Sequence, residues 1–262
     1  MKDTKLNALV IGLGKIGFNY DSKFDYKEDN PDSSSRIISH ARAISCHPGF
    51  KLIAGIDLDK KSLENFQNVY KKPAFKNIDS FKKNNIKVDF VVISVTPENQ
   101  PSLLEEVLDK LKPKIILLEK PLSTTFKETL KIKQLIYANP SVTFEVNYVR
   151  RFIPIVKKWK DKINSGELGE FIYGNISYGK GLLTNGSHFI NLAQNWLGTL
   201  HLYKKLSLGI KYNNYDYESS FVLKKESNNA LIGVHSIGGF GLRAGEIDLW
   251  FEKGRICLLN SG

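Results

Sequence analysis

The sequence contains few residues of the kinds that cross-link a secreted chain, bind zinc or cross a membrane. Its 262 residues include only two cysteines, Cys46 and Cys257, which lie far apart and form no CxxC motif. A disulfide framework or a metal site is therefore not expected. The N-terminus is polar and shows no signal peptide, and the apolar run from Leu6 to Leu13 is too short to span a bilayer. We expect a protein of the reducing cytoplasm with no membrane contact.

Arginine is also scarce. The 38 basic residues are 32 lysines and 6 arginines, and with 27 acidic residues they give a formal net charge of +11. The lysines are scattered and form no dense basic block with interleaved aromatic residues, so we expect no nucleic-acid partner. The positive charge is still compatible with anionic small molecules such as nucleotides or sugar nucleotides.

The first half of the chain alternates strand-like and helix-like segments, which predicts an α/β fold. An apolar strand at residues 6–12 runs directly into the motif G-x-G-x-x-G at residues 12–17. Glycines there let the chain turn tightly and let backbone N–H groups approach a pyrophosphate, whose charge the next helix N-terminus favours. The cofactor-binding residues predicted in this turn are Gly12, Gly14, Lys15, Ile16 and Gly17.

A second apolar strand at residues 50–57 ends in an acid. Asp57 is placed to bind the adenosine ribose hydroxyls of a dinucleotide, which favours NAD. Lys60 and Lys61 follow closely and leave NADP possible, because they could tolerate a 2′-phosphate. A site for S-adenosylmethionine is the weaker alternative, since an acid usually precedes the glycines of such sites and residues 9–11 are apolar.

The spacing between the glycines and the acid is unusually long. It amounts to 57 − 17 = 40 residues, against about 20 in the usual pattern. The excess lies at residues 19–35, which are rich in Asp, Ser and Asn and predict a loop before a helix that resumes near Arg36. This loop is either a tolerated surface insertion or a flap over the cofactor or substrate.

Two further strands, at residues 88–95 and 114–118, end in proline-containing motifs. In an open parallel sheet, ligands bind beyond the carboxyl ends of the strands. These two ends, the glycine turn and Asp57 therefore predict one cofactor site at the same edge of the sheet. The residues that the two motifs add to this site are Thr96, Pro97, Glu119 and Lys120.

The chain resembles the glucose–fructose oxidoreductase and inositol dehydrogenase family of NAD(P)-dependent oxidoreductases over nearly its whole length. The matching stretches are GLGKIG, SHARAI…HPGFKLIAGIDLD, VVISVTPEN, EKPLSTT, EVNYVRRFIPIVKKWKDKINSGELGEF and GLLTNGSHFINLAQNWLG. Of these, Glu-Lys-Pro after a strand is far more specific to the family than the glycine motif. The resemblance implies an N-terminal Rossmann domain with a parallel sheet at residues 1–122. It also implies an α+β substrate domain with a mostly antiparallel sheet at residues 123–262, through which homo-oligomers form.

The resemblance also implies roles for single residues. Lys120 matches the family lysine that points at the nicotinamide and the substrate, where it can share in proton transfer. Glu119 is implied to lie near the cofactor ribose, and Pro121 to fix the turn, for which a cis bond is one solution. His188 matches a family histidine at the start of a helix, which takes the substrate hydroxyl proton.

The chain departs from the family beside this histidine. Family members commonly carry an acid four residues before it and another three residues after it, and this chain has Thr184 and Asn191 there. Uncharged groups can orient His188 but do not supply a carboxylate charge. We therefore predict Lys120 and His188 as catalytic residues, with Thr184 and the adjacent Asn185 as accessories.

These residues predict an NAD(P)-dependent dehydrogenase that acts on the CH–OH group of a sugar, polyol or sugar nucleotide. Family analogy favours a role in carbohydrate metabolism such as polysaccharide biosynthesis. The missing acids leave a non-catalytic dinucleotide-binding protein or a truncated pseudoenzyme as an alternative. Reduction of an imine or another unsaturated bond is a further alternative, because it could proceed without His188. Family members usually continue beyond the last residues here, so we expect either a short or a truncated substrate domain.

Overall fold

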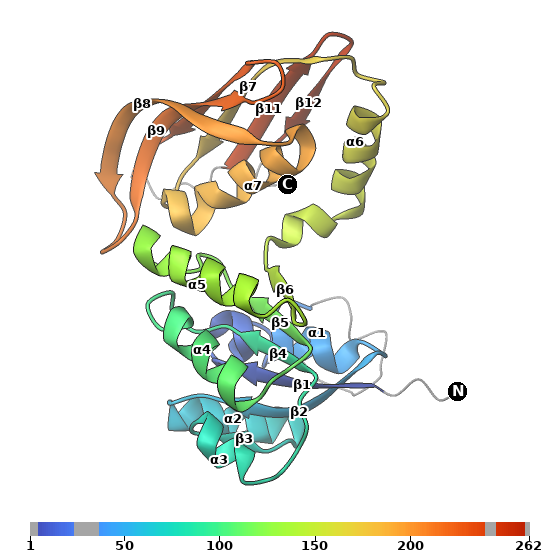
Figure 1. The fold of residues 1–262 in the computed structure, drawn as a ribbon, viewed down its shortest axis with the longest axis vertical. Helices are drawn as coiled ribbons and strands as arrows, with labels where there is room; N and C mark the ends of the chain where they lie inside the picture. Colours follow the sequence, from blue (N-terminus) through green and yellow to red (C-terminus); the bar gives the residue numbers. More distant parts are fainter. Residues whose placement is uncertain (1–4, 24–36, 239–244, 260–262) are drawn as a thin grey trace. The chain divides into compact units, whose positions relative to one another are not determined.

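A computed structural model describes residues 5–23, 37–238 and 245–259. Most of the loop predicted at residues 19–35, with its two alternatives, and the helix start near Arg36 lie outside these residues, as do residues 260–262. The chain divides into two compact units, Met1–Asn147 and Tyr148–Gly262, and each has its own hydrophobic core (Figure 1).

The N-terminal unit is built on a six-stranded sheet in the order β3-β2-β1-β4-β5-β6, in which every neighbouring pair is parallel. Its strands are β1 Leu6–Ile11, β2 Phe50–Ile56, β3 Ala74–Phe75, β4 Phe90–Ile93, β5 Ile115–Leu118 and β6 Thr143–Val146. Its helices are a π-helical turn η1 Lys15–Asn19, then α1 His40–Cys46, α2 Lys60–Tyr70, α3 Ile78–Lys82, α4 Gln100–Lys110 and α5 Phe126–Ala138.

Alternate residues of the central strand β1 enter two different cores, one on each face of the sheet. Leu9 and Ile11 pack with residues of α3, α4 and α5, whereas Ala8 and Val10 pack with residues of α1 and α2. A parallel sheet must be covered on both faces, which explains why its strands are almost continuously apolar in sequence. The predicted parallel α/β fold of this half is confirmed.

The C-terminal unit contains a second six-stranded sheet in the order β12-β11-β7-β10-β9-β8. Its neighbouring strands are antiparallel except for the parallel pair β7 and β10, so the predicted mostly antiparallel sheet is also confirmed. Its strands are β7 Phe171–Tyr178, β8 Leu200–Lys211, β9 Tyr217–Lys225, β10 Leu231–Ser236, β11 Gly245–Phe251 and β12 Gly254–Leu258. Its helical segments are η3 Val149–Phe152, α6 Pro154–Asn164, η4 Leu182–Gly186 and α7 Ser187–Leu197.

One face of this second sheet packs against α7 (Figure 1). The helix contributes Phe189, Leu192 and Trp196 to the core, and Trp196 also donates from Nε1 to the Val156 carbonyl of α6 at 3.1 Å. The apolar face of α7 is therefore used for packing. Its first turn carries His188 on a half-buried position beside this core.

The boundary between the two units lies after Asn147 and not after residue 122, where we expected it. The reason is that β6 completes the first sheet and α5 packs into its core. β6 pairs with β5 in parallel register, and Ile132 of α5 is fully buried in the core under the sheet. The assignment of substrate binding to the second unit remains a prediction.

Candidate cofactor and catalytic site

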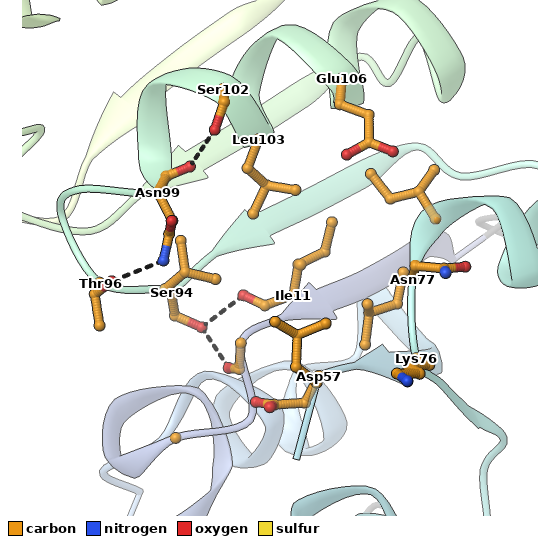
Figure 2. A pocket seen from close by; sticks show the side chains of 16 residues that line it. Ile11, Asp57, Lys76, Asn77, Ser94, Thr96, Asn99, Ser102, Leu103 and Glu106 are labelled. Atoms are coloured by element: carbon orange, nitrogen blue, oxygen red, sulfur yellow. Dashed lines mark hydrogen bonds between the residues drawn. The ribbon is translucent and has the colours of Figure 1, made fainter. Parts of the chain in front are cut away.

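The glycine turn after β1 is fixed by contacts with Ser94, which directly follows the neighbouring strand β4. Gly12 has a φ of +92°, and a Cβ atom at this position would lie 2.5 Å from the Ser94 carbonyl oxygen. A Cβ on Gly17 would lie 1.9 Å from the Gly12 carbonyl oxygen. The Ser94 hydroxyl points at the turn and bonds to the carbonyls of Ile11 and Gly12 at 3.1 and 2.8 Å (Figure 2). These two glycines are therefore required by packing within the protein.

Gly14 differs from the other two glycines because a Cβ there would meet no atom within 4 Å. It is exposed and lies between the end of β1 and the turn η1. Its side of the turn is open, which is what close approach of a phosphate group to the backbone requires. The helix expected behind the glycines is only the five-residue π-helical turn Lys15–Asn19 within the described residues. Lys15 is exposed on it and Ile16 is half-buried.

Asp57 follows β2 and holds the glycine turn from the other side. Its Oδ2 atom accepts a hydrogen bond from the Leu13 N–H at 2.5 Å, and its Oδ1 atom accepts one from the Asp59 N–H at 2.9 Å. The carboxylate is half-buried beside the glycine turn (Figure 2). A ribose hydroxyl at this position would meet a negatively charged acceptor. Lys60 and Lys61 are exposed on α2, and Lys60 lies 3.7 Å from Glu64.

A pocket of about 470 Å³ opens at these strand ends. That volume is within the range of small-molecule and cofactor sites. The predicted cofactor residues Gly12, Gly14, Asp57 and Thr96 line it, whereas the other predicted cofactor residues are not part of its lining. Several lining residues were not predicted from the sequence. They come from the segment before α3, from α4 and from the residue that precedes α4 (Figure 2), namely Lys76, Asn77, Asn99, Ser102, Leu103 and Glu106. The apolar spacing of α4 was visible in sequence, but its pocket-facing side was not.

Thr96 is fixed near the rim of this pocket by α4. The Asn99 Nδ2 atom donates to the Thr96 hydroxyl oxygen at 3.1 Å, and the Ser102 hydroxyl donates to the Asn99 carbonyl at 3.2 Å (Figure 2). Neutral polar groups therefore line the pocket where the chain enters α4, namely Thr96, Asn99 and Ser102. Pro97 follows Thr96 in the chain and does not line the pocket.

The Glu-Lys-Pro motif lies directly after β5. The Lys120–Pro121 peptide bond is cis, in agreement with one of the expected solutions for the turn. The Pro121 carbonyl accepts a hydrogen bond at 2.7 Å from Nε2 of Gln100, which is fully buried. Contacts on the proline side therefore fix the backbone next to Lys120, whose side chain is half-buried.

Glu119 is buried and tied to two other elements of the same unit. Its Oε1 atom lies 2.7 Å from Nε2 of His40 at the start of α1 and accepts a hydrogen bond from Nδ2 of Asn147 at 2.6 Å. Glu119 does not line the pocket. Its implied contact with the ribose stays a prediction. His40 was missed as a site residue because 79 residues separate the two partners and no spacing rule joins them.

His188 is the second residue of α7. Its ring meets the ring of Tyr148 edge to face, with centroids 5.6 Å apart and planes at 86°. Burial raises the pKa of Tyr148, so this phenol remains protonated over the physiological range. Arg150 stacks over the ring of Phe189 at 4.9 Å, and burial lowers the pKa of its guanidinium. Aromatic and cationic groups therefore surround the first turn of α7.

Thr184 and Asn185 lie on the π-helical turn η4 that leads into α7. The Thr184 hydroxyl donates to Asp216 at 2.8 Å, and Nδ2 of Asn185 donates to the Gly179 carbonyl at 2.9 Å. Asp216, which comes from the connection between β8 and β9, was not predicted as a site residue. Asn191 is half-buried on α7.

Neither a metal site nor a membrane span is found in the part of the chain that the structure describes. No group of three or more His, Cys, Asp or Glu side chains there could hold a metal ion. No helix among these residues is long and apolar enough to cross a bilayer.

Comparisons with known proteins agree with this geometry. Residues 6–148 match the family model described as an oxidoreductase family with an NAD-binding Rossmann fold, the GFO/IDH/MocA family. This match spans more than half of the chain. No protein of curated function matches the sequence.

Several solved structures share the fold of the whole chain. The WlbA dehydrogenase of Bordetella pertussis, in complex with NADH and UDP-GlcNAcA, is 14% identical, with a TM-score of 0.80 over 100% of this chain and 76% of that one. Myo-inositol 2-dehydrogenase of Lactobacillus plantarum is 18% identical, with a TM-score of 0.73 over 97% and 76% of the two chains. A myo-inositol dehydrogenase of Corynebacterium glutamicum is 14% identical, with a TM-score of 0.75 over 98% and 76%.

The residues of the N-terminal unit fit the cofactor that the family match implies. Gly14 leaves its face of the turn open, the Asp57 carboxylate lies beside it, and the pocket extends from both toward α4. The pyrophosphate would lie on the glycine turn and the adenosine ribose at Asp57. The chain belongs to the GFO/IDH/MocA family of oxidoreductases, and its N-terminal unit is an NAD(P)-binding Rossmann domain.

Proposed function

We propose that the protein is an NAD-dependent dehydrogenase that acts on a secondary hydroxyl, or the matching ketone, of a sugar, a polyol or a sugar nucleotide. The observation that carries this proposal is the position of Lys120. It lies two residues after the end of β5, at the same edge of the sheet as the glycine turn and Thr96. The substrate class is supported by two proteins of similar fold, one named a myo-inositol 2-dehydrogenase and one solved with NADH and UDP-GlcNAcA.

The proposed reaction needs one group that removes a proton and one that binds the reacting oxygen. NAD supplies a hydride acceptor when it is bound. The alcohol loses a hydride from its carbon and a proton from its oxygen, and the C–O single bond becomes a carbonyl. We assign the proton to His188, because an imidazole can accept it near neutral pH. Lys120 binds the same oxygen and stabilises the negative charge that develops there.

Asp57 supports NAD in preference to NADP. Its Oδ2 atom is fixed by the Leu13 N–H at 2.5 Å, so the carboxylate cannot easily leave the glycine turn. A 2′-phosphate at the adjacent ribose would bring a second negative charge close to this carboxylate. Lys60 and Lys61 are exposed on α2 and do not line the pocket.

The cytoplasm is the compartment that we propose for this activity. Both cysteines, Cys46 and Cys257, are free thiols, which fits a reducing environment. Carbohydrate metabolism, and the synthesis of polysaccharide precursors in particular, is the proposed context.

The first experiment is a fluorescence titration of the purified protein with NADH and with NADPH. We expect NADH to bind more tightly, because of Asp57. Turnover is then measured with NAD over a panel that contains myo-inositol, free sugars and UDP-sugars such as UDP-GlcNAcA. We expect Lys120→Ala to lower kcat by about 100-fold or more, the usual contribution of a group in proton transfer. His188→Ala should lower kcat by a similar factor without changing the affinity for NADH.

Each alternative function corresponds to a distinct result of this experiment. Tight NADH binding with no turnover of any compound would indicate a non-catalytic dinucleotide-binding protein. Turnover of an imine that survives His188→Ala would indicate reduction of an unsaturated bond. Turnover unaffected by Lys120→Ala would refute the assignment of that lysine.

A further inference from the structure

Two buried carboxylates lie behind the loop that leads to His188. Asp216 is 1% exposed and Glu218 is 4% exposed, and both come from the region where β8 turns into β9. Glu218 bonds mostly to the backbone of the loop. Its Oε1 atom accepts from the N–H groups of Lys180 at 2.7 Å and Gly181 at 3.3 Å, and its Oε2 atom accepts from the Ser236 hydroxyl at 3.0 Å. Glu218 is therefore an anchor for the start of the loop.

Asp216 makes a different set of contacts, because it reaches a side chain of the predicted catalytic segment. Its Oδ1 atom accepts from the Leu183 N–H at 2.9 Å. Its Oδ2 atom accepts from both the N–H and the hydroxyl of Thr184, each at 2.8 Å. Thr184 occupies the position, four residues before His188, at which the family resemblance implies an acid. The carboxylate that is missing from that position is thus supplied by a residue 32 positions later in the chain.

The position of the Asp216 carboxylate is fixed from several sides. The Asn213 side chain accepts hydrogen bonds from the N–H groups of Tyr215 and Asp216, at 3.0 and 2.9 Å. Gly181 has a φ of +80°, and a Cβ atom on it would lie 2.2 Å from Oδ2 of Asp216. The loop is therefore built around the carboxylate, with glycine at a position where any side chain would collide with it.

The pKa of the buried Tyr178 phenol is affected by the negative charge in this region. Burial, together with the negative charges of Asp216 and Glu218, holds its pKa well above the ordinary value. Its hydroxyl consequently stays protonated and donates to the Ser219 carbonyl at 2.5 Å. The Tyr178 ring in turn lies against Gly186 at the end of η4. The two carboxylates and this phenol hold both ends of the segment that precedes His188.

The hydrogen bond to Asp216 decides what Thr184 can do for a ligand. A threonine hydroxyl has one hydrogen to donate and two lone pairs that accept. Because the hydrogen is directed at a carboxylate, the bond is charge-assisted and strongly oriented. Toward any other group, Thr184 Oγ1 therefore acts as an acceptor. Such an acceptor recognises the O–H of an alcohol and not a carbonyl oxygen.

We propose that Asp216 is the relocated carboxylate of this substrate site and acts as a positioning residue through Thr184. It takes up the Thr184 O–H and thereby makes Oγ1 an acceptor that orients a substrate hydroxyl beside His188. The inference rests on the proposed function, because it needs an alcohol substrate. It also accounts for the neutral residue at position 184: a carboxylate charge is retained next to this position, but it comes from the β8–β9 connection.

A purely structural role for Asp216 makes different predictions, so the two can be separated. If Asp216 only anchored the loop through the Leu183 and Thr184 N–H groups, removal of the Thr184 hydroxyl would leave catalysis almost unchanged. If the hydroxyl is the functional link, removal of the hydroxyl and removal of the charge disable the same interaction. Their effects on kcat/KM would then not be additive.

The test compares Thr184→Val, Thr184→Ser, Asp216→Asn and the double variant Thr184→Val/Asp216→Asn in the full-length protein. Turnover is measured with the compound of the substrate panel that the wild type oxidises best. We expect Thr184→Val and Asp216→Asn each to lower kcat/KM by about tenfold or more, as for loss of a hydrogen bond to a charged group. Thr184→Ser should keep most of the wild-type kcat/KM. The double variant should have a kcat/KM only slightly below that of the less active single variant. The affinity for NADH should be the same in all of them.

Glu218→Gln is the matched control, because it alters the second buried carboxylate of the same loop without touching the Thr184 hydroxyl. We expect it to lower the melting temperature with a smaller effect on kcat/KM. Should Asp216→Asn fail to fold, the contrast between Thr184→Val and Thr184→Ser decides alone. Full activity of Thr184→Val would overturn the inference and leave the proposed function intact. Absence of wild-type turnover over the whole panel, with NADH still bound, would overturn both.

Discussion

At the scale of single residues, the three glycines of the turn have separable roles, although the motif treats them alike. Gly17 is required by the protein itself, since a Cβ there would lie 1.9 Å from the Gly12 carbonyl. Gly14 meets nothing within 4 Å, so only a bound ligand requires the absence of its side chain. We therefore expect a side chain at Gly17 to affect folding and one at Gly14 to affect cofactor binding.

This difference gives a prediction that needs no substrate. Gly17→Ala should destabilise the fold by about 1–3 kcal/mol, the usual cost of inserting a group into a packed region. Gly14→Ala should keep the wild-type melting temperature but weaken NADH binding by about tenfold, because its methyl group occupies the space for the pyrophosphate. Thermal denaturation and NADH fluorescence titration of both variants check this. A Gly14→Ala protein that binds NADH as tightly as the wild type would place the cofactor elsewhere.

Residues of the site that follow a strand end could be predicted from sequence, and those that act through a distant partner could not. Gly12, Asp57, Thr96 and Lys120 each follow an apolar run, so the sheet alone brings them to one edge. His40 and Asp216 follow no such rule, because their partners Glu119 and Thr184 are 79 and 32 residues away. In the sequence, an acidic residue that is buried in a polar loop looks the same as one that is exposed to solvent. Only the fold distinguishes the two.

At the scale of the elements, Asp89 links the starts of three strands in the N-terminal sheet. Its Oδ2 atom accepts a hydrogen bond from the Asn7 N–H at 3.1 Å, one residue before the pairing of β1 with β4 begins. Its Oδ1 atom lies 3.1 Å from Nζ of Lys114, which precedes β5. The bond to Lys114 and the bond to the Asn7 N–H hold the pKa of this carboxyl below its ordinary value. The charged form therefore stabilises the native sheet.

The pH dependence of this contribution follows from the direction of the shift. The carboxyl has a lower pKa in the folded state, so its contribution is complete above the unfolded pKa, about 3.9. It is lost as the pH falls through the lower folded pKa. Asp89→Asn should cost about 1 kcal/mol at pH 7, a modest value because Lys114 is exposed and water screens the pair. The difference from the wild type should shrink below about pH 4.

Urea denaturation at pH 7 and at pH 3 measures this difference. Asp79→Asn is the matched control, because that carboxylate pairs with Lys110 but is 67% exposed. It should leave stability nearly unchanged at both pH values. A cost of Asp89→Asn that is equal at pH 7 and pH 3 would contradict the assigned role of the charge.

The elements also show where periodicity could not set a boundary. Apolar spacing correctly gave the strands that precede Asp57, Thr96 and Glu119. It could not show that a sixth parallel strand, β6, still belongs to the first sheet, because a short run such as residues 143–146 looks alike in either unit. The boundary was therefore expected too early.

At the scale of the whole molecule, homo-oligomer formation through the C-terminal sheet remains a prediction. The edge strand β8 is the surface at which we expect the contact between copies. β8 is twelve residues long and exposed along almost all of its length. Leu206, Leu208 and Ile210 alternate along it and are 49%, 68% and 60% exposed. A long, apolar edge strand is a surface that proteins normally cover. We propose that a second copy of this chain covers it.

Sedimentation equilibrium at micromolar concentration tests this proposal directly. The wild type should have a mass that is a multiple of the monomer mass, and the double variant Leu208→Lys/Ile210→Lys should sediment as a monomer, because two buried ammonium groups would be left unpaired at the interface. Tyr137→Lys is the matched control, since Tyr137 is 72% exposed on α5 of the other unit. It should leave the mass unchanged. A monomeric wild type would show that β8 is not covered by a second copy, and an oligomer that survives both lysines would place the contact on another surface.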